Sequence, residues 1–121
     1  MIAFTSAALF LGACGDSQRK EEVTEAHVVE IVTFKLREGV STDAFRVANR
    51  NVENGHVSKQ PGFISRKTAR NEEGWLVIVE WKDIESAEAS MKSFADAPAT
   101  KGFIEVIDPK SMHMQRFTIE R

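Results

Sequence analysis

The sequence of 121 residues contains no tyrosine, a single cysteine and no excess of basic charge. One cysteine excludes an internal disulfide framework and any cysteine-rich metal site. The 16 Lys and Arg are balanced by 18 Asp and Glu, so the basic surface that neutralises nucleic-acid phosphates is not expected. Its three histidines, His27, His56 and His113, form no close pair. We therefore expect one domain with neither a metal site nor a nucleic-acid partner.

The first 13 residues contain no charged side chain and are dominated by large apolar ones, whereas the chain turns polar at Gly15. A helix of this length is too short to cross a bilayer core of about 30 Å. An uncharged apolar run at the start of a chain is typical of the hydrophobic region of an export signal. The usual positive charge before that region is absent here.

The run ends in Leu11-Gly12-Ala13-Cys14, which resembles the lipobox of bacterial lipoproteins. This resemblance implies a signal peptide over residues 1–14, lipidation of Cys14 and a flexible polar tether over residues 15–26. It places the protein in the bacterial cell envelope, anchored by lipid on the periplasmic face, and Gly15 after the cysteine resembles sorting to the outer membrane. The alternative is that residues 1–14 are an extension and Cys14 an ordinary thiol.

The folded part begins near residue 27, where apolar residues recur alternately with the periods of strands and of helices. The pattern predicts strands over residues 28–36, 63–70, 75–82 and 112–119, and helices over 41–60, 84–94 and 98–107. Ser41 and Asp83 are expected to cap the first two helices. This β-α-β-β-α-β order, with one extra short helix, predicts an α+β ferredoxin-like domain with a four-stranded antiparallel sheet and helices on one face.

Both alternating positions of the predicted strands are apolar. The odd-numbered set is Val29, Ile31, Trp75, Val77, Val79 and Trp81, and the even-numbered set is Val28, Val32, Phe34, Leu36, Leu76 and Ile78. We interpret the two sets as the two faces of the sheet. A sheet with one solvated face alternates more cleanly, so we expect a second copy of the chain to cover the face without helices, making a homodimer.

The stretches EIVTFKLREGVS (residues 30–41), QPGF (60–63) and VEW (79–81), followed by an alanine-rich helix, resemble the dimeric α/β-barrel superfamily. They are most similar to its antibiotic-biosynthesis-monooxygenase-like (ABM) branch. The resemblance covers residues 27–121 and implies a dimeric α/β barrel that binds a small, partly apolar molecule. Members include cofactor-independent oxygenases of aromatic polyketides, haem-degrading monooxygenases and proteins with no assigned activity.

The haem-degrading branch fits poorly, because Met91 stands where the iron-ligating histidine is expected and the strand around Thr33 lacks an asparagine. A methionine at this helical spacing is usually a core residue, and we expect no cofactor. The polyketide oxygenases fit in part: Trp81, Arg66 and Asn49 (or Asn51) lie in matching elements, although their tyrosine is missing. Cofactor-independent monooxygenase chemistry is one hypothesis. A non-catalytic structural or sensing homodimer of the envelope is the alternative.

Two acidic residues, Glu30 and Glu80, interrupt apolar runs, and a charge buried there must be paired. Basic candidates lie on neighbouring strands: Arg66, Lys67, His113 and Arg116. One hypothesis makes Glu80 an acid/base group, with His113 or Arg66 binding an anionic substrate. The alternative is a structural ion pair or a water-facing edge.

His56 lies on the apolar side of the first helix, where it would line the space between helix and sheet or be a packed residue hydrogen-bonded to backbone. Trp75 and Trp81 are expected in the core or an interface, or as a substrate platform. A cavity reached by Trp81, Glu80, His56 or Arg66 would favour binding or catalysis. A space filled by side chains would favour the non-catalytic alternative. The filling candidates are Phe45, Val52, Met91 and Phe94.

Overall fold

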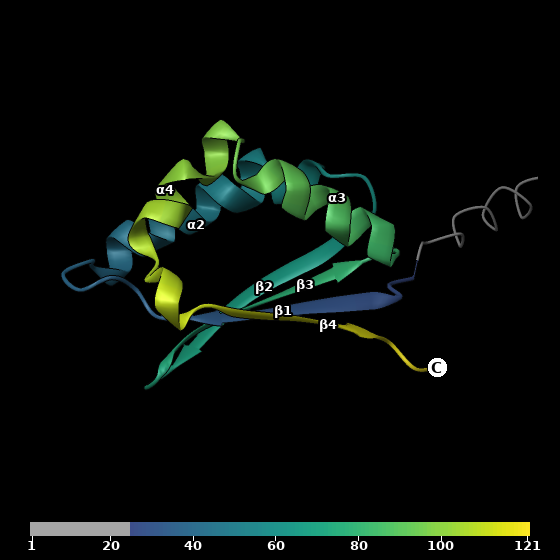
Figure 1. Cartoon of the computed structure of the whole chain (residues 1–121), viewed down its shortest axis with the longest axis horizontal. Helices are drawn as coiled ribbons and strands as arrows, with labels where there is room; N and C mark the ends of the chain where they lie inside the picture. The colour runs from purple at the N-terminus through teal and green to yellow at the C-terminus, as the bar shows by residue number, and fades with distance from the viewer. Residues whose placement is uncertain (1–24) are drawn as a thin grey trace, which may run out of the picture.

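The computed structural model describes residues 25–121 as one antiparallel sheet with its helices on a single face (Figure 1). The elements follow in the order β1 (Val28–Phe34), α2 (Thr42–Gly55), β2 (Phe63–Asn71), β3 (Gly74–Trp81), α3 (Ile84–Phe94), α4 (Lys101–Val106) and β4 (His113–Thr118). Short 3-10 helices cover Val57–Lys59, Pro98–Thr100 and Pro109–Ser111. The predicted β-α-β-β-α-β order with an extra short helix is confirmed. Cys14 and most of the predicted tether lie outside the described residues.

The strands pair in the order β2-β3-β1-β4, and every neighbouring pair is antiparallel. In Figure 1, α2, α3 and α4 all lie over the same side of this sheet. This is the ferredoxin-like arrangement, so the predicted fold class is confirmed. None of the described helices is long and apolar enough to cross a membrane.

Local chemistry explains where the helices begin and end. The Ser41 hydroxyl accepts from the amide of Ala44 at 3.0 Å, and the Asp83 carboxylate accepts from the amide of Ser86 at 2.9 Å. Both predicted caps are therefore present. The hydrogen bonds from Ser86 lower the pKa of Asp83 below its ordinary value. Helix α2 ends at Gly55 rather than near residue 60, because the chain tightens there into a 3-10 turn.

The strand register corrects the predicted assignment of faces. Val28 pairs with Trp81 and Glu30 pairs with Val79, so even-numbered residues of β1 share a face with odd-numbered residues of β3. The prediction that put odd-numbered residues of both strands on one face was therefore wrong. In the β1–β3 pairing an even-numbered residue always stands opposite an odd-numbered one. The face away from the helices nevertheless carries apolar residues: Val29, Ile31, Leu76, Ile78 and Phe117.

An aromatic cluster fills one end of the space between sheet and helices. Phe45 packs against Trp75 at a tilt, with ring centroids 4.3 Å apart, and the ring centroid of Phe103 lies 5.6 Å from that of Phe34. Each such pair contributes about 0.5–1.5 kcal/mol beyond area burial. At the other end Phe63 meets the Trp81 ring edge-on at 6.1 Å. The space between these two aromatic ends is not filled.

Candidate functional site

A cavity of about 390 Å³ lies between the helices and the middle of the sheet. Its walls are mostly apolar and come from all four strands and all three helices: Glu30, Val32, Val52, Val57, Arg66, Val77, Val79, Trp81, Ser90, Met91, Phe94, Phe103, Ile104, Ile107, Pro109, Met112 and Met114. Ligand sites commonly measure about 300–1,000 Å³ with few polar groups in apolar walls. Val52, Met91 and Phe94, which were candidates for filling this space, line the cavity instead.

A row of charged residues crosses the sheet at this cavity. The register aligns Arg66 of β2 with Val79 of β3, Val79 with Glu30 of β1, and Glu30 with Arg116 of β4. Partners across antiparallel strands point to the same face, so these side chains project toward the helices. A carboxylate therefore stands between two guanidinium groups on a surface that is otherwise apolar.

Glu30 is held by Arg116, whose Nε donates to Oε2 at 2.7 Å. The Glu30 side chain is only 7% exposed. A charge-assisted hydrogen bond of this length offsets part of the cost of keeping the carboxylate away from water. No side chain among residues 25–121 donates to the second oxygen, Oε1. Glu30 thus brings to the cavity wall a carboxylate whose second oxygen accepts from no side chain of the described residues.

Arg66 is held by two residues of α2 and is 2% exposed in its side chain. Its Nη1 donates to Glu53 at 3.2 Å and its Nη2 donates to Oδ1 of Asn49 at 2.8 Å. The Asn49 amide nitrogen in turn donates to Thr68 at 3.1 Å, which fixes the amide orientation. Burial lowers the pKa of Arg66, and the hydrogen bond and charge of Glu53 oppose that shift. An arginine remains protonated nonetheless.

Trp81 is 1% exposed and contributes an indole ring to the cavity wall. Its Nε1 has no hydrogen-bond acceptor among the described residues. Nη2 of Arg116 is also buried and has no acceptor among them. A buried donor without an acceptor costs about 1–3 kcal/mol. The polar end of this region therefore keeps unused hydrogen-bonding capacity.

The structure brings Trp81, Arg66 and Asn49 to one region, and it separates Glu80, His113 and His56 from it. Glu80 and His113 lie on the face away from the helices, because neighbouring residues of a strand alternate between faces. Glu80 accepts from the Ser65 hydroxyl at 2.8 Å, and His113 is exposed. Neither can reach the cavity.

His56 is buried but does not line the cavity. Its Nε2 shares a hydrogen bond with the Ser93 hydroxyl at 2.8 Å, and its ring meets Phe94 edge-on at 5.5 Å. Burial lowers the pKa of His56 from its ordinary value of 6.5. The predicted alternative of a packed histidine describes this position, but the partner of the ring is the Ser93 hydroxyl rather than the expected backbone group.

Sequence reasoning missed Glu30 as a cavity residue and Glu53 as the partner of Arg66. The signal for Glu30 was present, since it interrupts an apolar strand as Glu80 does. Choosing between the two required the register. One predicted pairing, of a buried glutamate with Arg116, is confirmed for Glu30.

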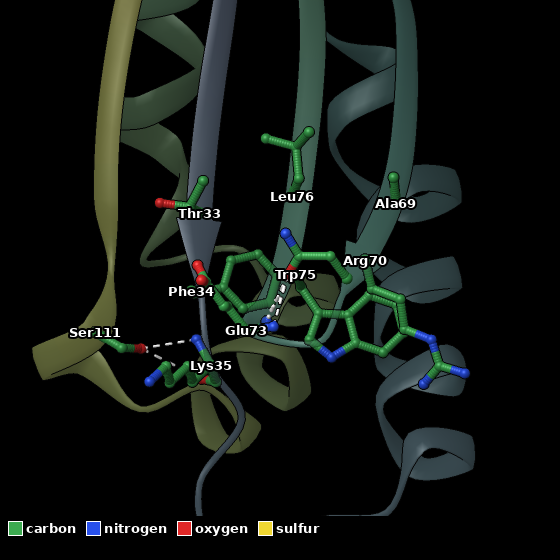
Figure 2. A pocket seen from close by; sticks show the side chains of 11 residues that line it. Thr33, Phe34, Lys35, Ala69, Arg70, Glu73, Trp75, Leu76 and Ser111 are labelled. Carbon is green, nitrogen blue, oxygen red and sulfur yellow. Dashed lines mark hydrogen bonds between the residues drawn. The ribbon is translucent and has the colours of Figure 1, made fainter.

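A second hollow, of about 400 Å³, lies at the hairpin end of the sheet. Figure 2 looks onto the sheet with the helices behind it and shows Thr33, Leu76 and Ala69 on three strands above Arg70 and Trp75. The guanidinium of Arg70 lies 5.3 Å from the Trp75 ring. The charged side chains that line this hollow, such as Arg70, are exposed. The hollow holds no buried charge of the kind found at Glu30, so the helix-side cavity is the candidate site.

Within residues 25–121 no group of three or more His, Cys, Asp or Glu side chains could hold a metal ion. The two charged residues of the cavity wall are each paired with a residue beside it, Glu30 with Arg116 and Arg66 with Glu53.

Comparison with solved structures shows which known proteins share this fold. No protein-family model matches the chain, and no curated protein matches it. Among solved structures, the chain is similar to SnoaB, a cofactor-independent oxygenase from Streptomyces nogalater, with a TM-score of 0.64, 15% identity, and coverage of 80% of this chain and 96% of that one. The two chains share a fold.

Two further structures extend the likeness. One is a dimeric protein of unknown function with a ferredoxin-like fold from Bacteroides fragilis, with a TM-score of 0.53, 18% identity, and coverage of 80% of this chain and 100% of that one. The other is a Dabb family protein with a ferredoxin-like fold from Mesorhizobium loti, with a TM-score of 0.54, 11% identity, and the same two coverages. At these identities the likeness concerns the fold alone.

Proposed function

We propose that this domain binds a small, largely apolar molecule in the cavity between helices and sheet, with the polar group of that molecule directed at Glu30 and Arg66. The observation that carries the proposal is the cavity of about 390 Å³ whose apolar walls enclose these two charged side chains. Apolar walls supply affinity through burial, and a few fixed polar groups set the orientation of the ligand.

A matched pair of substitutions in α2 tests binding. Val52 lines the cavity, whereas Val47 is 51% exposed on the same helix. Val52→Phe adds a ring to the cavity, and Val47→Phe adds the same ring outside it. With 1-naphthol as the probe and Trp fluorescence as the readout, Val52→Phe should weaken binding at least about tenfold, and Val47→Phe should leave it unchanged. Equal affinities for both variants would reject the cavity as the binding site.

For a reaction at this site we propose cofactor-independent monooxygenation. The specific support is Glu30, a carboxylate on the cavity wall whose Oε1 accepts from no side chain among residues 25–121. Glu30 would accept a proton from an activated C–H group of the substrate, and Arg66 would stabilise the resulting oxyanion. The substrate anion then reduces O₂, with one oxygen atom entering the product and the other leaving as water. The fold likeness to a cofactor-independent oxygenase agrees with this assignment.

Oxygen consumption with anthrone as the test substrate examines the reaction separately from binding. Loss of a general base typically costs about 10²–10⁴ in rate, so Glu30→Gln should slow oxygen uptake by at least about 100-fold while 1-naphthol still binds. A wild-type rate no faster than that in buffer would favour the non-catalytic alternative, a binding or sensing module.

We propose further that two copies associate through the sheet face without helices. This face presents Val29, Ile31, Leu76, Ile78 and the 47% exposed Phe117. Contiguous exposed apolar surface of this kind commonly marks an interface. The ferredoxin-like neighbour from B. fragilis is described as dimeric, which supports a homodimer here.

We propose that Cys14 carries the lipid that anchors the domain to the periplasmic face of an envelope membrane. The support is the sequence Leu11-Gly12-Ala13-Cys14 after an uncharged apolar run. Mass spectrometry of the mature protein should find an N-terminus at Cys14 with acyl chains, and Cys14→Ser should release the protein from membranes. An intact Met1 with a free thiol at Cys14 would overturn this part of the proposal.

A further inference from the structure

Most of the side chains that line the cavity are buried or half-buried. Among the residues that line it, the exposed ones are Met91, Ile104, Pro109, Met112 and Met114. They come from α3, from α4 and from the chain that enters and forms β4. Since β4 is an edge of the sheet, these exposed residues put the mouth of the cavity near this edge, on the side of the sheet where α3 and α4 lie in Figure 1.

Methionine is concentrated at this mouth. The chain has four methionines, and Met1 lies outside the described residues. The other three, Met91, Met112 and Met114, all line the mouth and are 42%, 47% and 37% exposed. They reach it from α3 and from the segment around the start of β4, more than 20 positions apart in sequence. The unbranched, polarisable thioether adapts its shape to apolar and aromatic partners. The mouth is thus an adjustable apolar collar around the path of a ligand.

Exposed thioethers are also side chains that peroxide oxidises. Hydrogen peroxide transfers one oxygen atom to sulfur, the O–O bond breaks, and water leaves. Sulfur is oxidised to the sulfoxide while the peroxide is reduced. The product is polar where the thioether was apolar, and methionine sulfoxide reductases reverse the change.

We propose that Met91, Met112 and Met114 form an oxidisable gate, in which sulfoxide formation at the mouth weakens the binding of apolar molecules in the cavity. The inference rests on the proposed binding function. Its physical basis is the position of the three side chains. After oxidation, an apolar ligand that passes or rests against the collar makes fewer apolar contacts there. It must also displace water from the sulfoxide oxygens. Glu30 and Arg66 lie deeper and are untouched by the modification.

The test uses the full chain labelled with ¹³C at the methionine methyl groups, 1-naphthol as the probe, and hydrogen peroxide as the oxidant. Methyl NMR reports the oxidation of each methionine, and the titration gives the affinity. Oxidation of the three mouth residues should weaken 1-naphthol binding by roughly tenfold, and a methionine sulfoxide reductase should restore it.

A triple variant Met91→Leu, Met112→Leu and Met114→Leu is the matched control, because leucine keeps the collar apolar but has no sulfur. The affinity of the untreated variant for 1-naphthol is its own baseline, and peroxide treatment should leave that baseline unchanged. Unchanged affinity of the oxidised wild type would overturn the gate. An equal loss in the triple-leucine variant would overturn it too, by placing the sensitive group elsewhere. Absence of binding before oxidation would instead reject the proposed binding function.

Discussion

The ion pair between Glu30 and Arg116 predicts how strongly the site depends on matched charges. Their N–O distance is 2.7 Å, and the side chains are 7% and 19% exposed. At an effective dielectric constant near 20, two unit charges at this distance attract by about 6 kcal/mol, most of which offsets their desolvation. Removing one partner of a buried pair costs about 3–5 kcal/mol. Because water can reach Arg116 in part, we expect Glu30→Met to lie near the lower end, at about 3 kcal/mol.

Urea unfolding of Glu30→Met, Arg116→Met and the double variant gives the coupling between the two side chains. The double variant should lie within about 1 kcal/mol of the wild type, because it leaves no unpaired charge in an apolar setting. For a domain of this size, the loss of about 3 kcal/mol in Glu30→Met corresponds to a fall in Tm of roughly 12–24 °C.

The exposed pair of Arg46 with Asp43, also held by a hydrogen bond, at 3.2 Å, supplies the control. Arg46→Met should change the free energy of unfolding by less than about 0.5 kcal/mol. The reasoning fails if Glu30→Met is no more destabilising than Arg46→Met. It fails equally if the double variant loses as much stability as the two single variants together.

Three further predictions concern the turn after α2, the buried histidine and the open sheet face. Gly62→Ala should destabilise the fold by at least about 1 kcal/mol more than Gly39→Ala in urea unfolding. Both glycines have φ near +85°, but a Cβ on Gly62 would clash with the Ser86 side chain, whereas Gly39 has open space; equal costs would contradict the contact. Burial lowers the pKa of His56 in the folded state, so below about pH 6.5 the unfolded chain binds a proton that the folded chain does not. The stability advantage of the wild type over His56→Gln should therefore be constant above about pH 7 and shrink as the pH falls. A stability difference that does not depend on pH would refute this. Ile78→Lys should convert the proposed dimer to a monomer in light scattering, because it places a charge in the apolar open face; a dimeric Ile78→Lys variant would move the interface elsewhere.

Much of the fold was predictable because its determinants are local in sequence. Phe45, Ala48 and Val52 recur at helical spacing and are all buried, and Ser41 and Asp83 cap the helices as predicted. The errors fall at element ends, where competing local hydrogen bonds decide, as in the 3-10 turn that follows α2.

The candidate site was only partly predictable, because it depends on which face each strand residue takes. Trp81 and Glu80 are neighbours, yet only Trp81 faces the helices. The decisive facts are long-range: the β1–β3 register, and an irregularity between Phe63 and Ser65 in β2. This irregularity lets Phe63 pair with Trp81 while Arg66 pairs with Val79, so both point toward the helices. Nothing in the order of residues along β2 alone specifies it.

The row formed by Arg66, Glu30 and Arg116 is hard to explain by packing alone. Replacing a buried ion pair with apolar side chains of similar volume is often neutral or stabilising by about 1–4 kcal/mol, and the walls around this row are already apolar. A domain that required only a core would gain from filling the cavity, since unfilled apolar space costs about 24 cal/mol per Å³ where side chains have been removed. The unfilled volume forgoes that stability, and the buried carboxylate of Glu30 carries a desolvation cost that its pair with Arg116 offsets only in part. Both features are what a partly apolar ligand with one polar group would use, and this is why we place the function of the chain there.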